Sequence, residues 1–396
     1  MVPEPGASNA RKRVSFGVLL LALVWVGSSP IWAQNKQSAF TGAATADLSQ
    51  KAFDQIDALT AAEFAKHPLA GVTVGVVTPK GLAWTKSYGF ADLDKKIPTS
   101  RDTVYRVGAI TKQFTALMLL QLAERGKVRV SDPVERYVPE ISQLSGQYPN
   151  ASPVTLLQLA MHTSGFAREP DNAETYAHNP LPEWDKSLLA AMPHAKYAAE
   201  PGTTFIYSTL GYSVLGLALS RAAGQSYAEY VERNIFDPLG MRHSALDVTP
   251  AIQPLLAVGY ETKDGKADAR KSTEDLKGRG YNVPSDAIFT TVDDLARFMS
   301  LWMLGGPESV LKTKSMQDNL SHGFFVFSNF AGAVGVGIQL GRYPDLIIAG
   351  HGGALAGYHA SAYFRPDAPV GIIVMRNADD GFQLDYVLNC LRVLAH

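Results

Sequence analysis

The hydrophobic pattern divides the chain into two sheet-forming ends and a helical middle. Near the start, apolar residues at roughly helical intervals predict a helix over Gln50–Lys66. Two apolar runs rich in valine, Gly71–Thr78 and Leu82–Gly89, are separated by a Pro-Lys-Gly turn and predict a hairpin. A last helix is predicted over Phe382–Leu394. Before this helix, the hydrophobic pattern shifts to the period of strands and predicts four of them: Val336–Leu340, Leu346–Ala349, Tyr358–Phe364 and Val370–Met375.

The middle of the chain is mostly helical and rich in loops, because repeated prolines break it into short pieces. The clearest predicted helices are Leu156–His162, Tyr212–Ala223 and Thr291–Leu304, the last with a capping signature at its start. The polar stretch Lys263–Gly280 is predicted to be an exposed loop. The fold class that follows is α/β of the α+β kind. An antiparallel sheet flanked by helices comes from about 50–108 and 331–396, and an all-helical lobe comes from about 109–330.

The N-terminus has the pattern of an export signal. Three basic residues, Arg11-Lys12-Arg13, precede the apolar run Val14–Gly27, and the small residues around Ala33 suit a cleavage site. The run is short for a membrane span, which needs ~20 residues. We therefore expect a signal peptide at 1–33, a linker at 34–49, and a secreted or periplasmic mature protein without a membrane span. The alternative is an uncleaved N-terminal anchor, which would place the same domain outside the membrane.

Composition and charge exclude several classes of site. The net charge is −1, which gives no support for a nucleic-acid partner, and no run of like charges suggests an interaction tail. Cys390 is the only cysteine, so neither an intrachain disulfide nor a cysteine-rich metal site is possible. The nine histidines show no zinc-site spacing, and no phosphate-binding glycine loop occurs. We expect no metal and no cofactor, and the sequence leaves the oligomeric state open.

The segment Tyr105–Lys127 predicts a strand end, a turn at Gly108 and a helix that closes at Gly126. Lys112 follows Ala109 by three residues, so both side chains lie on one face of the helix at the positive end of its dipole. A nucleophile followed by lysine at this spacing is the Ser-x-x-Lys arrangement of the penicillin-recognising acyl enzymes. Here the first position is alanine.

Several phrases occur in order along the chain: YGFADLDKKIPTSRDTVYRVGAITKQFTA, QLAMHTSGF, EPGTTFIYSTLGYSVLGLALSRAAGQSY, NIFDPLGM, TTVDDLARFM and GHGGALAGYHA. From about Lys51 to the C-terminus, the chain resembles the serine hydrolase family of class C β-lactamases, D-Ala-D-Ala carboxypeptidases, related esterases and penicillin-binding proteins. The resemblance implies a β-lactamase/transpeptidase-like fold with a cleft between the two lobes. It also places the family's nucleophilic serine on Ala109.

The resemblance assigns Tyr207-Ser208-Thr209 to the family's Tyr-x-Asn element. The phenol of Tyr207 can act as a general base if a neighbouring cation lowers its pKa, and Lys112 can supply that charge. Thr209 lies where asparagine is expected. Its single, shorter hydroxyl cannot contact both the lysine and a substrate amide in the same way, so we expect weaker substrate binding at this position.

The stretch His351-Gly352-Gly353-Ala354 matches the family's third element, Lys-Thr-Gly or His-x-Gly, which the resemblance places on an edge strand lining the cleft; in the sequence, Gly350–Gly353 falls just before a predicted strand. The two glycines let a ligand backbone approach closely, and the histidine can hydrogen-bond a carboxylate or help to move a proton. In the family the oxyanion donors are backbone N–H groups, which map to Ala109 and Ala354. An alanine side chain leaves those donors intact.

Three other features have plainer interpretations. His162-Thr163-Ser164-Gly165 belongs to a family phrase that shapes the cleft wall, and we interpret it as structural. Ser309-Val310-Leu311-Lys312 is a second Ser-x-x-Lys, but it occurs in the wrong part of the order and is taken as a coincidence. Thr111 is a poor substitute nucleophile, because adjacent helical residues point about 100° apart.

Alanine at position 109 removes the hydroxyl that would form an acyl-enzyme. We predict an exported protein of this fold whose ligand is a small molecule or a cell-wall peptide. It acts on or binds peptidoglycan peptides, β-lactams or small esters, with hydrolysis impaired. Two alternatives remain: an active serine hydrolase whose serine was deliberately replaced, and a non-catalytic cell-envelope binding protein. Departures at both Ala109 and Thr209 favour natural loss, whereas the persistence of Lys112, Tyr207 and His351 favours retained catalytic machinery.

Overall fold

Two strands that are apolar on both faces form the centre of the sheet. β1 (Gly71–Thr78) pairs antiparallel with β13 (Val370–Arg376), with Val74 opposite Val374. Successive side chains of a strand point to opposite faces. Val374 accordingly packs in one hydrophobic cluster and Ile373 in another, on the other side of the sheet. Both faces of these strands are therefore covered, which explains their nearly continuous apolar sequences.

The computed structural model describes residues 47–396, apart from 264–265, 321–323, 326–331, 381 and 396. They belong to one compact unit that spans residues 37–396. The signal peptide expected at 1–33 and most of the linker expected at 34–49 lie outside the described residues. Within the described ranges, no helix is both long and apolar enough to cross a membrane.

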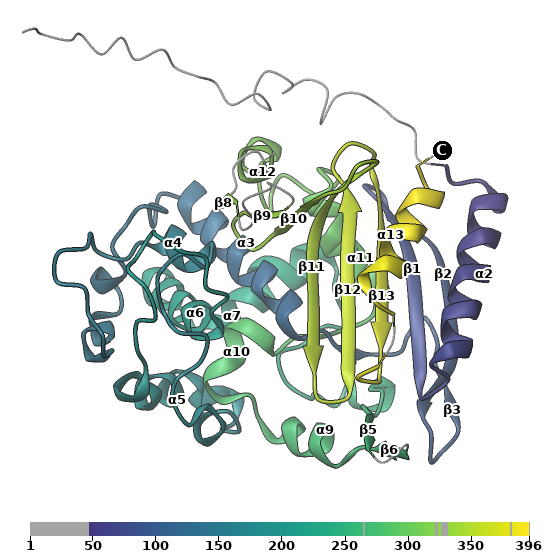
Figure 1. Ribbon diagram of the computed structural model, residues 1–396, viewed down its shortest axis with the longest axis horizontal. Coiled ribbons are helices and arrows are strands. Elements are labelled where there is room, and N and C mark those ends of the chain that lie inside the picture. The colour runs from purple at the N-terminus through teal and green to yellow at the C-terminus, as the bar shows by residue number, and fades with distance from the viewer. Residues whose placement is uncertain (1–46, 264–265, 321–323, 326–331, 381, 396) are drawn as a thin grey trace, which may run out of the picture. The chain divides into compact units, whose positions relative to one another are not determined.

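Nine strands of the described residues form one antiparallel sheet, in the order β3-β2-β1-β13-β12-β11-β10-β9-β8 (Figure 1). The remaining strands of this sheet are β2 (Gly81–Asp92), β3 (Ile97–Pro98), β8 (Phe324–Phe325), β9 (Gly332–Val334), β10 (Gln339–Arg342), β11 (Ile347–Leu355) and β12 (Tyr358–Arg365). Two further pairs are short: β4 (Tyr105–Arg106) with β7 (Phe289–Thr290), and β5 (Glu261–Lys263) with β6 (Lys266–Asp268).

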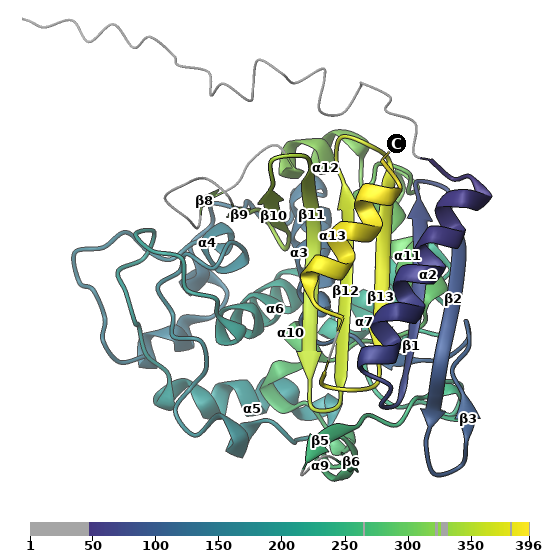
Figure 2. The same ribbon diagram turned by 45° about the vertical axis from the view of Figure 1, so that its right-hand side comes forward.

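Helices cover both faces of this sheet. α2 (Gln50–Lys66) and α13 (Leu384–Val393) lie together on one face, as Figure 2 shows, and α11 (Val292–Trp302) packs on the other. α11 comes so close to β1 that a Cβ added to Gly75 would lie 2.6 Å from the side chain of Val292. The other α-helices of the described residues are α3 (Thr111–Glu124), α4 (Leu156–Ala160), α5 (Trp184–Ala191), α6 (Thr209–Ala223), α7 (Tyr227–Val231), α8 (Asp237–Leu239), α9 (Arg270–Glu274), α10 (Val283–Asp286) and α12 (Thr313–Leu320).

The predicted arrangement of one antiparallel sheet from both ends of the chain is confirmed. The helix Gln50–Lys66 and the strand Gly71–Thr78 have the predicted bounds, and the second strand of the hairpin continues to Asp92. The capping signature is confirmed as well, because the hydroxyl of Thr291 accepts the backbone N–H of Asp294.

Two predictions about the middle of the chain were wrong. Lys263–Gly280 is not simply an exposed loop: it contains β6 and α9, and the buried hydroxyl of Ser272 donates to the carbonyl of Gly259. The helix predicted over Thr291–Leu304 was placed in the lobe 109–330, but as α11 it lies on the sheet. Its apolar face is buried against strands β1 and β13, which come from the two ends of the chain.

Two strand boundaries near the third motif were also wrong. The strand predicted over Val336–Leu340 begins only at Gln339, because Gly337 has a φ of 72° and turns the chain first. β11 runs from Ile347 to Leu355, beyond the predicted end at Ala349. The motif His351–Ala354 therefore lies inside a strand and not just before one.

Candidate active site

Among the strands that the structure describes, the second half of β11 has a partner on only one side. β10 pairs with Ile347–Gly350, whereas His351–Leu355 pair with β12 alone among the described strands. The expected edge position is thus correct for the motif, although β11 as a whole is an inner strand of the sheet. An unpaired strand edge presents free backbone N–H and C=O groups.

The start of α3 lies against this open half-strand because two glycines permit the contact. Gly108 has a φ of 50°, in the left-handed region, and a Cβ added to it would lie 3.1 Å from the backbone nitrogen of Ala354. A Cβ added to Gly353 would lie 2.0 Å from the carbonyl oxygen of Val107 and 2.9 Å from the backbone nitrogen of Ala109. Ala109, in the short 3₁₀ turn before α3, is partly exposed, and Ala354 is exposed. The backbone segments of the two expected oxyanion donors are therefore neighbours at the surface.

Lys112 is the second residue of α3 and is buried, with only 1% of its side chain exposed. Its ammonium group donates to the carbonyl of Ser285 at 3.3 Å and lies 3.4 Å from a carboxylate oxygen of Asp286. Burial opposes the charged form, but the carboxylate of Asp286, together with electrostatic and hydrogen-bond interactions with Tyr207, outweighs burial and raises the pKa of Lys112. The lysine is therefore an ammonium ion at neutral pH.

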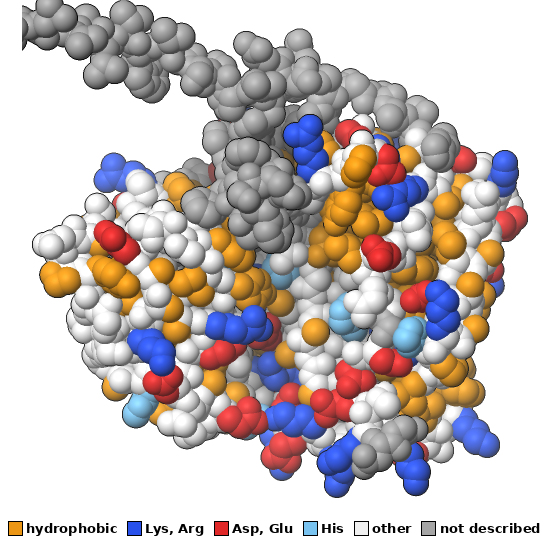
Figure 3. All heavy atoms as spheres, in the orientation of Figure 1, with side chains coloured by type: hydrophobic (Ala, Val, Ile, Leu, Met, Phe, Trp, Pro, Cys, Tyr) orange, Lys and Arg blue, Asp and Glu red, His pale blue; other side chains and the backbone are white. Residues whose placement is uncertain are grey.

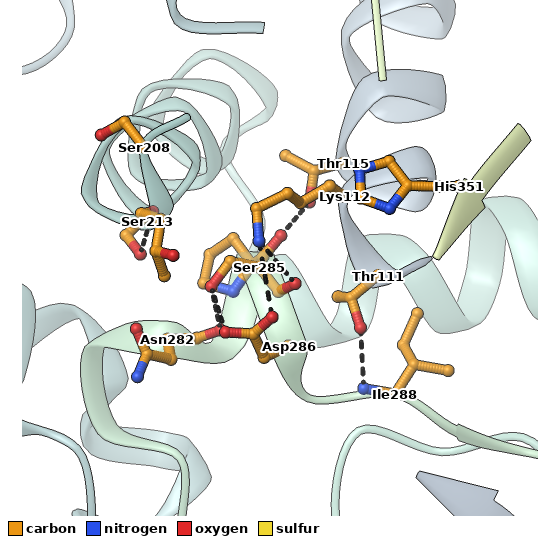
Figure 4. A network of polar contacts seen from close by, with 12 residues as sticks. Thr111, Lys112, Thr115, Ser208, Ser213, Asn282, Ser285, Asp286, Ile288 and His351 are labelled. Carbon is orange, nitrogen blue, oxygen red and sulfur yellow. Dashed lines mark hydrogen bonds and ion pairs between the residues drawn. The ribbon is translucent and has the colours of Figure 1, made fainter. Parts of the chain in front are cut away.

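Asp286 is a site residue that no sequence pattern predicted. It ends α10, and Figure 4 shows the Lys112 side chain pointing from α3 directly at it. Its second carboxylate oxygen accepts a hydrogen bond from the hydroxyl of Ser285 at 3.2 Å. No local motif marks this aspartate, since 174 positions separate it from Lys112 and only the fold brings them together.

Tyr207 lies beside the lysine, as predicted. The ammonium group of Lys112 is 5.0 Å from the centre of the Tyr207 ring, and the guanidinium of Arg168 is 5.2 Å from it. Burial raises the pKa of the Tyr207 phenol, and the positive charge of Lys112 offsets only part of that effect. The lysine acts in the expected direction, but the phenol remains protonated at neutral pH.

Two buried histidines complete the cluster. The ring of His351 is 6.2 Å from that of Tyr207, and burial together with the charge of Lys112 lowers the pKa of His351 to about 4. The ring of His162 is 4.4 Å from Tyr207, and its Nδ1 accepts the backbone N–H of Ser208 at 3.0 Å. Burial lowers the pKa of His162 as well. Both imidazoles are neutral at pH 7. His162 contacts the chain on both sides of the tyrosine, because its backbone carbonyl also accepts the N–H of Ile206 at 2.8 Å.

Among the described residues, Thr209 makes no hydrogen bond to this cluster. It is buried as the first residue of α6, and no hydrogen bond connects its hydroxyl to Lys112 or Tyr207 among the described residues. Thr111 is likewise unsuited to act as a nucleophile, because its buried hydroxyl accepts the backbone N–H of Ile288. Ser309 lies in a turn and not at the start of a helix.

The surface is hollowed between the helices around α6 and α10 and the strands β11 and β12, and acidic and basic side chains gather at the lower end of the hollow (Figure 3). A cavity of about 340 Å³ lies elsewhere, near β2, β3 and α9, and Lys112, Tyr207 and His351 do not line it. In the part of the chain that the structure describes, no group of three His, Cys, Asp or Glu side chains is placed to hold a metal ion.

Comparison with known proteins is consistent with this geometry. The model of the Beta-lactamase family matches residues 53–394. The chain belongs to the β-lactamase family. Among curated relatives of this β-lactamase-family protein, Protein flp of Staphylococcus aureus strain N315 is 26% identical over 338 residues. The matched region covers 85% of this chain but only 65% of that protein.

Solved structures share the fold of this β-lactamase-family protein. The octameric penicillin-binding protein homologue from Pyrococcus abyssi has a TM-score of 0.73 and 22% identity, and the match covers 86% of this chain and 77% of that one. The D-alanine carboxypeptidase AmpC from Burkholderia cenocepacia has a TM-score of 0.71 and 21% identity, over 87% of this chain and 98% of that one. These likenesses confirm the predicted fold, and at such identities they establish the fold alone.

Proposed function

We propose that this β-lactamase-family protein is exported and binds peptidoglycan peptides, β-lactams or small esters without forming an acyl-enzyme. Ala109 carries the proposal. The resemblance assigns it the position of the family's serine, and it lies partly exposed beside Gly353 and three residues before Lys112. A methyl group cannot attack a carbonyl carbon, so the step that forms a covalent intermediate is absent.

The open half of β11 supports a peptide-like ligand. A ligand backbone laid along His351–Leu355 would pair with the backbone groups that have no partner among the described strands. Its carbonyl oxygen would accept the backbone N–H groups of Ala109 and Ala354, which do not depend on the missing hydroxyl. The buried ammonium of Lys112 adds positive charge beneath this carbonyl.

The names of the similar proteins support the ligand class. One is a penicillin-binding protein homologue and another is a D-alanine carboxypeptidase. The basic and apolar N-terminal pattern of residues 1–33 supports export. A second candidate function, hydrolysis by a form with serine at position 109, is favoured by one observation: Lys112, Tyr207 and His351 still converge.

The test is to measure binding and covalent labelling on the same protein. The native chain is titrated with a D-Ala-D-Ala peptide and with a β-lactam, and is separately incubated with a fluorescent penicillin. We expect saturable, reversible binding and no covalent label. Ser309→Ala serves as the control for the other Ser-x-x-Lys and should behave like the native chain.

Two results would contradict the proposal. A covalent adduct on the native chain, or turnover of the β-lactam, would reveal a nucleophile other than residue 109. No saturable binding of either ligand would remove the assignment of this cleft to peptidoglycan-like ligands. Export is tested separately, by fractionating cells that express the full chain.

A further inference from the structure

The segment that carries Asp286 is fixed to α3 at three points. The hydroxyl of Thr115 donates to the carbonyl of Pro284 at 2.5 Å, and Lys112 donates to the carbonyl of Ser285 at 3.3 Å. The backbone N–H of Ile288 donates to the hydroxyl of Thr111 at 3.1 Å. These contacts use consecutive turns of one helix, as Figure 4 shows, so the carboxylate between them has little freedom to move away from the lysine.

Burial strengthens the contact between Lys112 and Asp286. The side chains of the two residues are 1% and 14% exposed, and little water screens their attraction. The ammonium group has a charged partner in Asp286 and a carbonyl partner in Ser285. Both partners stabilise the protonated lysine.

The charge state of the lysine decides whether it can serve as a base. In acyl transfer by a Ser-Lys pair, the serine oxygen attacks the carbonyl carbon while its hydroxyl proton moves to the nitrogen lone pair of the lysine. An ammonium group has no lone pair to accept that proton. The other charged or titratable groups around Lys112 do not replace it as a strong base: the neutral phenols of Tyr207 and Tyr212, the neutral imidazoles of His162 and His351, and the guanidinium of Arg168 near Tyr207.

We infer that Asp286 is a second inactivating position: its carboxylate holds Lys112 as an ammonium ion, so a serine restored at position 109 remains a poor nucleophile until Asp286 is also replaced. The inference rests on the proposed function, because it concerns the same cleft. Asp286 acts through Lys112 and is a positioning residue. Catalysis in the native protein is then disabled at two positions: residue 109 has no hydroxyl, and Asp286 holds Lys112 in its protonated form.

The test compares labelling by a fluorophosphonate and a fluorescent penicillin across pH 6–10 in matched variants. Ala109→Ser alone should label slowly near pH 7.5 and accelerate only at alkaline pH. Ala109→Ser/Asp286→Asn should label at least about 10-fold faster near pH 7.5, with the rise in rate shifted to lower pH. Without the carboxylate, burial lowers the pKa of Lys112, and the base form appears earlier.

Two matched controls separate this effect from a general loss of charge. Ala109→Ser/Asp286→Glu keeps a carboxylate and should remain slow. Ala109→Ser/Asp293→Asn removes a carboxylate that pairs with Arg101 at the surface, and should label like Ala109→Ser. Thermal melting of each variant establishes that it is folded.

Three outcomes overturn the inference. Equal rates and equal pH profiles for Ala109→Ser with and without Asp286→Asn would show that the carboxylate does not restrain the lysine. A slower double variant would show that Asp286 accepts the proton and assists catalysis. No labelling of the double variant at any pH would show that releasing Lys112 does not restore the base.

A direct titration needs no serine variant. NMR of ¹³C-labelled lysine should show Lys112 titrating at a lower pH in Asp286→Asn than in the native chain, and an unchanged titration would also overturn the inference. Failure of the proposed function is recognised separately. If the native chain binds no peptide or β-lactam, the labelling comparison still reports on Lys112, because a fluorophosphonate reacts with an activated serine without needing peptide recognition.

Discussion

The ammonium group of Lys112 lies 3.4 Å from the carboxylate of Asp286, a residue 174 positions later in the chain. This contact defines the electrostatics of the cleft, because the ammonium and the carboxylate pair where the neighbouring phenol and imidazoles are neutral. It also separates two roles of the same lysine: a buried cation helps to bind a ligand carbonyl, whereas only a neutral amine can activate a nucleophile.

The ion pair between Lys112 and Asp286 should contribute to the stability of the fold. Asp286→Ala leaves the buried ammonium of Lys112 without its carboxylate, and we expect the free energy of unfolding to fall by about 3 kcal/mol. Asp293→Ala breaks the pair with Arg101, whose side chain is 58% exposed, and should cost less than about 1 kcal/mol. Urea denaturation of both variants measures the difference. Equal losses in the free energy of unfolding would mean that burial does not strengthen the Lys112–Asp286 pair.

Stability should decline as the pH falls from neutral toward pH 4, because of His351. Its pKa in the folded protein is lowered to about 4, while an unfolded histidine has a pKa near 6.5, so the unfolded state binds more protons between these values. The contribution of His351 to the free energy of unfolding is therefore fully present above pH 6.5 and is lost as the pH falls to about 4. The shift corresponds to about 3 kcal/mol.

Urea denaturation at several pH values measures this decline, with two variants for comparison. His351→Asn should flatten the slope, because asparagine does not titrate. His243→Gln changes an exposed histidine and should leave the slope as in the native chain. A native-like slope in His351→Asn would assign the acid sensitivity to other groups, of which the buried His162 is the first to examine.

Two adjacent glycines should differ sharply in their tolerance of a methyl group. A Cβ at Gly353 would lie 2.0 Å from the carbonyl oxygen of Val107, so Gly353→Ala must push β11 away from the start of α3. We expect a loss of about 2 kcal/mol in stability and of most ligand binding. At Gly352 the nearest atom to a new Cβ, the hydroxyl of Tyr363, is 3.5 Å away, so Gly352→Ala should be nearly neutral in stability. Similar losses in the two variants, in denaturation and in binding titrations, would refute the close contact.

Local patterns along the sequence predicted most of the secondary structure. The bounds of α2 and β1 could be read from periodicity, because each element buries a face within its own length. The turn at Gly108 and the spacing of Ala109 and Lys112 likewise depend on neighbouring residues. That Tyr207 and His351 belong to the same site followed from the family phrases, because no local pattern indicates it.

The sequence by itself determined most of the elements, the family and the absence of a hydroxyl at position 109. Tertiary structure alone decided that Asp286 lies beside Lys112, that the His162 ring lies 4.4 Å from the Tyr207 ring, and that the second half of β11 pairs on one side only among the described strands. It also decided that the phenol of Tyr207 stays protonated, because burial outweighs the lysine charge. The physical reason is common to all of these features: pairing across long separations and the balance between desolvation and charge depend on what surrounds a side chain in space, and sequence neighbours do not specify those surroundings.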